Sequence, residues 1–288
     1  MKKYFSLVLF AHSIFALPFA MIGFFLGVTT TDQPFSWLLF VLVLLCMVFA
    51  RNSAMAFNRY LDRDIDAKNP RTQMRDIPAG KIGANEALIF VIVNCLLFII
   101  ATKFINNLCF YLSPVALFVV LFYSYTKRFT ALCHLVLGLG LALAPIGAYI
   151  AVTGQFNIVP LLYSFAVLFW VSGFDIIYAL QDEDFDRAEK LHSIPAALGI
   201  KNALKLSVFL HVCSALCVIL PLLFTPFSWF YYIGVAFFCA MLIYQHLLVK
   251  PGDISKVNKA FATTNGFASL IFAICFLLDA LLRTHFIL

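Results

Sequence analysis

Residues 107–126 read NLCFYLSPVALFVVLFYSYT and contain no charged side chain in twenty positions. An α-helix rises about 1.5 Å per residue, so twenty residues cross the roughly 30 Å hydrocarbon core of a bilayer. Similar stretches recur along the 288-residue chain, which is 63% hydrophobic and 12% charged. Soluble domains have about a quarter charged residues. The composition therefore predicts an all-α integral membrane protein.

Nine apolar stretches have the length of a membrane helix. They are residues 5–27, 36–61, 85–104, 107–126, 130–152, 158–181, 203–224, 229–248 and 260–282. We expect one domain over residues 1–288, built as a nine-transmembrane-helix bundle that loops 61–84 and 182–203 cap. The eight cysteines all fall in apolar stretches and form no C-x-x-C pair, so we expect them to pack as small apolar residues.

The distribution of lysine and arginine predicts the orientation in the membrane. If the N-terminus is cytoplasmic, 17 of the 20 basic residues lie on the cytoplasmic side. Those segments are 1–4, 59–84, 127–129, 182–205 and 249–259. The positive-inside rule thus places the C-terminus on the opposite side of the inner (plasma) membrane. The net charge of +6 reflects this topology and does not indicate nucleic-acid binding.

One stretch contrasts with these apolar runs: residues 58–80 read NRYLDRDIDAKNPRTQMRDIPAG. Asn58, Asp62 and Asp66 are spaced i, i+4 and i+8. On a helix this spacing places three oxygen-bearing side chains on one face. The stretch lies at the end of the second apolar run, where a membrane helix is expected to leave the bilayer.

A second acidic cluster follows the sixth apolar run. Asp182 and Asp186 repeat the i, i+4 spacing, and Asp175 and Tyr178 precede them on nearly the same helix face. The two clusters follow even-numbered spans, so they emerge on one side of the membrane and suggest a loose internal repeat. Two such carboxylate faces would repel each other unless cations lay between them.

The residue types in the clusters indicate which ligand they bind. The acids supply oxygen alone, which favours a hard ion such as Mg²⁺, and magnesium often bridges carboxylates to substrate phosphates. Arg71, Arg75, Lys127 and Arg128 could hold phosphate oxygens. No G-x-x-x-x-G-K-[ST] loop for a nucleotide is present. A lipid diphosphate fits the membrane setting, and the 33 phenylalanines and 11 tyrosines could line a channel for its tail.

Four segments resemble the UbiA-type membrane prenyltransferases. NRYLDRDID followed by NPRT is similar to the first aspartate motif of that family, and DIIYALQDEDFD is similar to the second. YSYTKRFT, residues 123–130, resembles the aromatic–Lys–Arg element after the fourth span, and LHSIPAALG resembles the segment after the second motif. The resemblance implies transfer of a prenyl group from an isoprenyl diphosphate to an electron-rich aromatic ring.

The resemblance also implies roles for individual residues. Magnesium ligands would be Asp62, Asp66, Asp182 and Asp186. Substrate contacts would be Asn58, Arg71, Arg75, Tyr123, Lys127, Arg128 and Tyr178, of which Arg71 and Lys127 would also act on the diphosphate during catalysis. Asp175 would orient the acceptor phenol or help to remove its proton. Metal ions stabilise the charge on the leaving oxygen, and a membrane pocket keeps water from the allylic cation.

The acceptor remains open between two aromatic acids. The NPRT element and the form of the second motif resemble the branch that acts on 4-hydroxybenzoate, in ubiquinone synthesis. The stretch RDIPAG, with Asp76 where that branch has a proline, resembles enzymes that prenylate 1,4-dihydroxy-6-naphthoate on a route to menaquinone. We expect no obligate protein partner.

Two other classes of protein compete with this interpretation. A cation-coupled secondary transporter would also carry intramembrane Asp, Asn and Arg, but its site is expected at the midplane. A non-catalytic protein on the same scaffold would have lost motif carboxylates, and all are present.

Several further polar residues and glycines have a structural interpretation. Arg51 and Asn52 are expected to form hydrogen bonds between helices, and contact with substrate is the less favoured interpretation. Packing or interfacial roles are expected for His12, His134, His211 and His246, and Gly23 and Gly27 form a G-x-x-x-G that signals helix packing only weakly.

Overall fold

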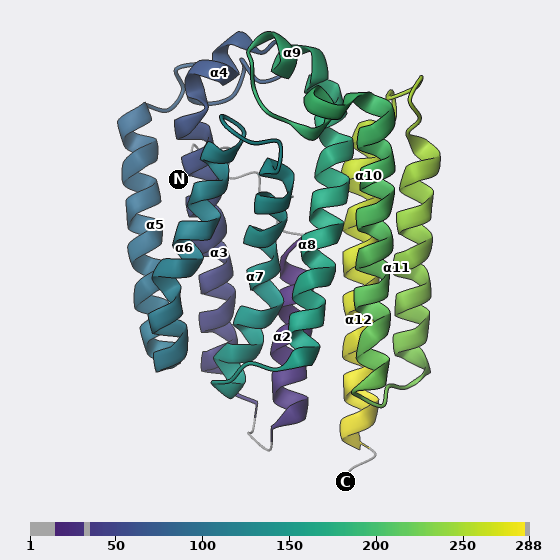
Figure 1. Ribbon diagram of the computed structural model, residues 1–288. Helices are drawn as coiled ribbons and strands as arrows, with labels where there is room; N and C mark the ends of the chain where they lie inside the picture. Colours follow the sequence, from purple (N-terminus) through teal and green to yellow (C-terminus); the bar gives the residue numbers. More distant parts are fainter. Residues whose placement is uncertain (1–14, 32–34, 286–288) are drawn as a thin grey trace.

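A computed structural model describes residues 15–31 and 35–285. The helices are α2 (Leu17–Thr30), α3 (Trp37–Leu61), α4 (Arg63–Lys68), α5 (Ala84–Ile105), α6 (Asn107–Thr126), α7 (Cys133–Thr153), α8 (Ile158–Ala179), α9 (Glu183–Ala188), α10 (Ile194–Ile219), α11 (Trp229–Leu248) and α12 (Asn265–His285). The long helices run side by side as one bundle, and the short helices α4 and α9 lie together at one end of it (Figure 1).

Eight helices of the described chain are long and apolar enough to cross a membrane. The expected stretch 107–126 coincides with α6, and the expected span 229–248 coincides with α11. The expected first span, 5–27, is represented by α2, whose fourteen residues are shorter than a full span. Residues 5–14 of that stretch lie outside the described residues, so the count of nine is not confirmed.

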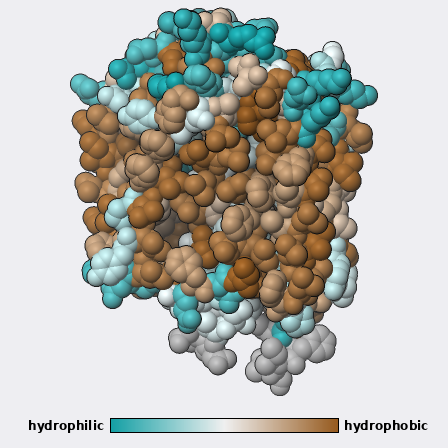
Figure 2. Space-filling model, in the orientation of Figure 1, coloured by the Kyte–Doolittle hydropathy of each residue, from teal (hydrophilic) through white to brown (hydrophobic). Residues whose placement is uncertain are grey.

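The outer surface of the bundle is apolar. On α5 and α6, Ile89, Leu96, Phe104, Val115 and Phe118 are each more than half exposed. Figure 2 shows a broad hydrophobic belt between two more hydrophilic ends. A soluble monomer rarely exposes so large an apolar area. Hydrocarbon is the solvent that suits this surface, which confirms a multi-pass membrane protein.

Helix α8 forms the centre of the aromatic core. The Trp170 side chain is fully buried, with its ring centroid 5.4 Å from that of Phe19 on α2 and 5.8 Å from that of Phe238 on α11. Its indole nitrogen donates a hydrogen bond of 2.8 Å to the Asn265 side chain on α12. Because buried polar groups in a membrane need partners, this bond fixes α8 against α12.

The contact between α2 and α7 depends on glycine. A Cβ atom added to Gly23 would lie 2.0 Å from the carbonyl oxygen of Pro145, and one added to Gly27 would lie 2.8 Å from the Val152 Cβ. The G-x-x-x-G pattern therefore marks a close approach of two helices. Between α3 and α5, Asn52 donates a 3.0 Å hydrogen bond to Asn94, as its interpretation as an interhelical residue predicts.

The segment after the second acidic cluster differs from the expected loop 182–203. Residues 180–182 form a 3₁₀ turn, α9 follows, and α10 begins at Ile194, nine residues before the expected span 203–224. The Ser193 hydroxyl accepts a hydrogen bond from the Ala196 amide and so caps α10. Gly199 has φ +73°, a left-handed conformation that glycine tolerates and that breaks the helix. The apolar pattern of the sequence does not reveal the short capped first part of α10, which ends at the Gly199 kink.

Candidate functional site

The first acidic cluster keeps its helical spacing although α3 ends at Leu61. The Asp62 amide donates to the Asn58 carbonyl oxygen at 2.9 Å, and the Asp66 amide donates to the Asp62 carbonyl oxygen at 2.7 Å. The three side chains consequently lie along one face, and the Asn58 amide donates to the Asp62 carboxylate at 3.0 Å. Asp62 and Asp66 are only 1% and 4% exposed, so their charges require compensation.

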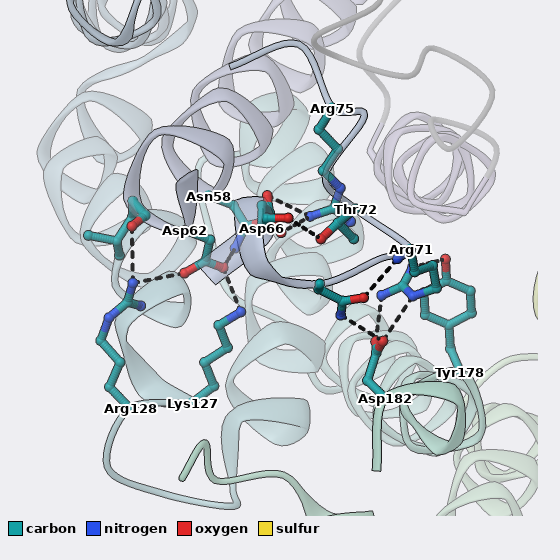
Figure 3. Close-up of polar contacts among 12 residues, drawn as sticks. Asn58, Asp62, Asp66, Arg71, Thr72, Arg75, Lys127, Arg128, Tyr178 and Asp182 are labelled. Atoms are coloured by element: carbon teal, nitrogen blue, oxygen red, sulfur yellow. Dashed lines mark hydrogen bonds and ion pairs between the residues drawn. The ribbon is translucent and has the colours of Figure 1, made fainter. Parts of the chain in front are cut away.

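Two cations from the end of α6 compensate Asp62. The Lys127 ammonium lies 2.7 Å from one carboxylate oxygen of Asp62, and the Arg128 guanidinium lies 2.9 Å from the other. Arg128 also donates to the Leu61 carbonyl oxygen at 3.1 Å and so satisfies a carbonyl at the end of α3. Both basic residues of this element thus contact the same carboxylate (Figure 3).

Asp66 has its counter-ion within the same loop. One terminal nitrogen of Arg75 lies 2.7 and 2.9 Å from the two Asp66 carboxylate oxygens. The Thr72 hydroxyl donates to the Asp66 backbone carbonyl at 3.1 Å. These contacts hold residues 72–75 against Asp66 on α4.

Arg71 joins this loop to the second acidic cluster. Its Nε and Nη2 atoms donate to the two Asp182 oxygens at 2.9 and 2.5 Å, and its Nη1 donates to the Tyr178 hydroxyl at 3.0 Å. The Asn69 amide donates to Asp182 at 3.1 Å. Burial opposes charge on Arg71, but the hydrogen bonds and charge of Asp182 outweigh it and raise the pKa of the guanidinium. In Figure 3 Arg71 lies between Asp182 and Tyr178.

The remaining expected residues surround the same end of the bundle. Asp186 hydrogen-bonds with the Ser193 side chain and lies within electrostatic range of Asp182 and Lys127. Tyr123 lies within electrostatic range of Asp62 and Asp175, which come from the two different clusters. The structure thus brings all the expected site residues to one end, from segments up to about 130 positions apart in the sequence.

His134 is buried, as expected for a packing histidine, and it also has a specific polar partner. The side chain is 3% exposed, but its Nδ1 lies 2.7 Å from a carboxylate oxygen of Asp175 on α8. The Ile194 amide donates to the other ring nitrogen, Nε2, at 3.3 Å. His134 is therefore a hydrogen-bonded partner of a site residue. The 41 positions between His134 and Asp175 carry no spacing signal, so only the packing of α7 on α8 could reveal the pair.

The carboxylates are paired with basic side chains in this arrangement. Over residues 15–31 and 35–285, no three His, Cys, Asp or Glu side chains are grouped closely enough to hold a metal ion. Asp62, Asp66 and Asp182 instead face four cations: Lys127, Arg128, Arg75 and Arg71. The donors are carboxylate oxygens next to flexible basic side chains, a chemistry that fits Mg²⁺ with a phosphate. The assignment of individual metal ligands stays a prediction.

A helical membrane bundle with acidic and basic side chains clustered at one end defines the class of protein. Comparison with known proteins identifies the family. Residues 16–273 match the UbiA prenyltransferase family. A 4-hydroxybenzoate octaprenyltransferase of Tolumonas auensis is 30% identical over 77% of this chain and 78% of its own length. One from Francisella tularensis subsp. mediasiatica is 28% identical over 79% of this chain and 80% of its own.

Solved structures agree with these sequence comparisons. The apo structure of a UbiA homologue from Aeropyrum pernix K1 superposes with a TM-score of 0.84 and 30% identity, over 93% of this chain and 98% of that one. A homologue from Archaeoglobus fulgidus bound to DMAPP and Mg²⁺ superposes with a TM-score of 0.77 and 20% identity, over 96% and 99%. The chain belongs to the UbiA prenyltransferase family, which confirms the resemblance and the expectation of a prenyltransferase.

Proposed function

We propose that the protein transfers a polyprenyl group from an isoprenyl diphosphate to a hydroxylated aromatic acid, with Mg²⁺ as cofactor, in respiratory quinone synthesis. The observation that carries the proposal is the pairing of three aspartates with four basic side chains at one end of a membrane bundle. The Archaeoglobus fulgidus homologue, whose structure contains DMAPP and Mg²⁺, supports the cofactor and the class of donor.

The ion pairs suggest how this site would accept a magnesium diphosphate. Asp62, Asp66 and Asp182 are each held by Arg or Lys, so a metal with its phosphates can take the place of these basic partners. Asp62, Asp66, Asp182 and Asp186 would hold the metal, while the released basic groups hold phosphate oxygens. Such an exchange keeps these three carboxylates compensated before and after binding, which avoids the large cost of an unpaired buried ion.

The basic residues then act on the leaving group. Magnesium, when bound, would stabilise the charge that develops on the departing diphosphate. Arg71 has the planar geometry for two parallel hydrogen bonds to phosphate oxygens, as it now makes to Asp182. Lys127 and Arg128 would neutralise charge from the side of α6. Helices α3 and α8 would keep the allylic cation in an apolar environment, away from water.

The acceptor would bind deeper in the bundle, near Arg51. This arginine lies seven residues before Asn58 on α3, about 10 Å further into the membrane. Its Nε atom is buried with no hydrogen-bond partner in the described chain. A buried cation in a membrane needs an anion, and the carboxylate of an aromatic acid would provide it. This assignment replaces the interpretation of Arg51 as a helix-packing residue.

Two acceptors fit these features: 4-hydroxybenzoate, named in the bacterial relatives, and 1,4-dihydroxy-6-naphthoate, which the RDIPAG variant favours. Charge asymmetry supports a plasma-membrane protein with the site and the N-terminus facing the cytoplasm and the C-terminus opposite. A cysteine placed at Lys190 should then react with a membrane-impermeant maleimide only after the membrane is opened. A cysteine at Gln155 should react in intact cells, and the reverse pattern would contradict the orientation.

Product formation by the purified protein in detergent tests the activity. Each acceptor is offered with an isoprenyl diphosphate and Mg²⁺, beside a matched reaction with EDTA. We expect a prenylated acid that disappears on chelation and returns with excess Mg²⁺. Absence of product with both acceptors, together with cation-dependent solute uptake in proteoliposomes, would favour the transporter instead.

A further inference from the structure

Asp175 differs from the three ion-paired aspartates of the site in its partner. Asp62, Asp66 and Asp182 each bind Arg or Lys, whereas the closest contact described for Asp175 is the imidazole of His134. Asp175 lies seven residues before Asp182 on α8, about 10 Å deeper in the bundle. Its side chain is 22% exposed, so a substrate can reach it while His134 stays buried.

The contacts of His134 define its tautomer. The Ile194 amide is a donor, so Nε2 of His134 must accept and cannot carry a proton. The proton of the neutral ring is then on Nδ1, which donates to Asp175 at 2.7 Å. The Ile194 amide thus makes Nε2 an acceptor, and this makes Nδ1 the donor, as in other sites where one ring nitrogen determines the role of the other.

A neutral donor has a different effect on a carboxylate from that of a cation. An adjacent Arg or Lys stabilises the anion and makes the carboxylate a weaker base. An imidazole N–H fixes the orientation of Asp175 without a full opposing charge. The described partner of Asp175 is a ring nitrogen, whereas Asp62 and Asp182 both face guanidinium or ammonium groups.

The reaction requires a proton acceptor beside the ring. When a ring carbon of the acceptor attacks C1 of the prenyl group, a C–C bond forms and the C1–O bond to diphosphate breaks. Its electron pair leaves with the diphosphate. The hydrogen on the attacked ring carbon must then depart as a proton, and the C–H electron pair restores the aromatic ring.

We propose that His134 is a positioning residue that holds the Asp175 carboxylate as the acceptor of this ring proton. The inference rests on the proposed function and deepens it. The Asp175 carboxylate accepts the proton and becomes a neutral acid. It releases the proton to water when the product leaves. His134 does not touch the substrate and keeps its own proton throughout.

The same contacts join this pair to the segment between α9 and α10. Ile194 is the first residue of α10, directly after residues 189–193. The backbone amide of His192 donates to the Lys127 carbonyl oxygen at 2.7 Å, and the Cys133 thiol donates to the His192 carbonyl oxygen at 3.4 Å. The orientation of the base thus depends on the segment that follows the second aspartate motif.

Substitution of His134 separates the proton step from diphosphate departure. His134→Leu removes both contacts, while His134→Gln retains one donor and one acceptor. Ser172→Ala is a matched control, because the Ser172 hydroxyl donates to the His134 carbonyl oxygen at 3.2 Å and does not touch its ring. Transfer is measured with normal and ring-deuterated acceptor, and departure by exchange of ¹⁸O between bridging and non-bridging positions of the isoprenyl diphosphate.

We expect His134→Leu to lower transfer about 100-fold, the lower end of what a general base contributes. Oxygen exchange should persist, and a primary deuterium isotope effect should emerge that is absent in the wild type. His134→Gln should recover most of the transfer, and Asp175→Asn should behave like His134→Leu. Ser172→Ala should match the wild type.

Three results would overturn the proposal. They are normal transfer in His134→Leu, an equal loss of oxygen exchange and transfer, or a loss of transfer without a deuterium isotope effect. If His134→Leu is not obtained as folded protein, Asp175→Asn and His134→Gln test the same step. Failure of the proposed function is distinct, because the wild type would then make no prenylated product.

Discussion

Arg71 allows a quantitative test of how the site binds diphosphate. Its guanidinium makes three hydrogen bonds, two to Asp182 and one to the Tyr178 hydroxyl. We expect an equal number to phosphate oxygens in the substrate complex. The side chain is 32% exposed, so each bond is worth about 1 kcal/mol, below the range for charged bonds in a buried site.

Arg71→Met should therefore lose about 2–3 kcal/mol, which corresponds to roughly a 30- to 150-fold fall in kcat/KM for the isoprenyl diphosphate. Arg71→Lys keeps the charge but only one of the three bonds, so a fall of roughly 10- to 30-fold is expected. The assay is steady-state transfer in detergent, with the isoprenyl diphosphate varied at saturating Mg²⁺ and acceptor.

Lys68 provides a matched control for loop docking. Its ammonium lies 2.7 Å from Glu189, so it links the same two segments as Arg71, but its side chain is 60% exposed. An exposed pair is worth under about 1 kcal/mol, and Lys68→Met should cost less than about fivefold. If Lys68→Met impairs transfer as much as Arg71→Met, the two segments need only be held together, and our reasoning about phosphate contacts is wrong.

Three further substitutions test the site and the fold. Asp62→Ala should abolish transfer while the protein still inserts and elutes as a monodisperse peak, and near-normal activity would contradict a role in metal or diphosphate binding. Gly23→Ala forces a Cβ against the Pro145 carbonyl and should lower the free energy of unfolding by about 1–3 kcal/mol. Gly147→Ala, which meets open space, should leave the thermal midpoint unchanged, and equal midpoints would refute the close approach. Asp279→Ala removes the buried carboxylate that pairs with Arg283. It should lower the free energy of unfolding by about 3–5 kcal/mol, and the protein that folds should have a normal KM.

Much of this protein could be predicted from local patterns in the sequence. Apolar length determines where a helix can cross a bilayer, so α6 and α11 fall on the expected residues. The i, i+4 spacing of Asn58, Asp62 and Asp66 depends only on helical geometry and survives the end of α3. These features need no knowledge of what lies next to each helix.

Partnerships across the bundle were decided by the tertiary structure. The pairing of Arg71 with Asp182 spans 111 positions, and that of Arg128 with Asp62 spans 66. The buried His134 is also the partner of Asp175 because α7 packs against α8. Spacing along the chain carries information only over a few helical turns, whereas a buried charge is compensated by whichever opposite charge the packing of the helices brings within about 3 Å.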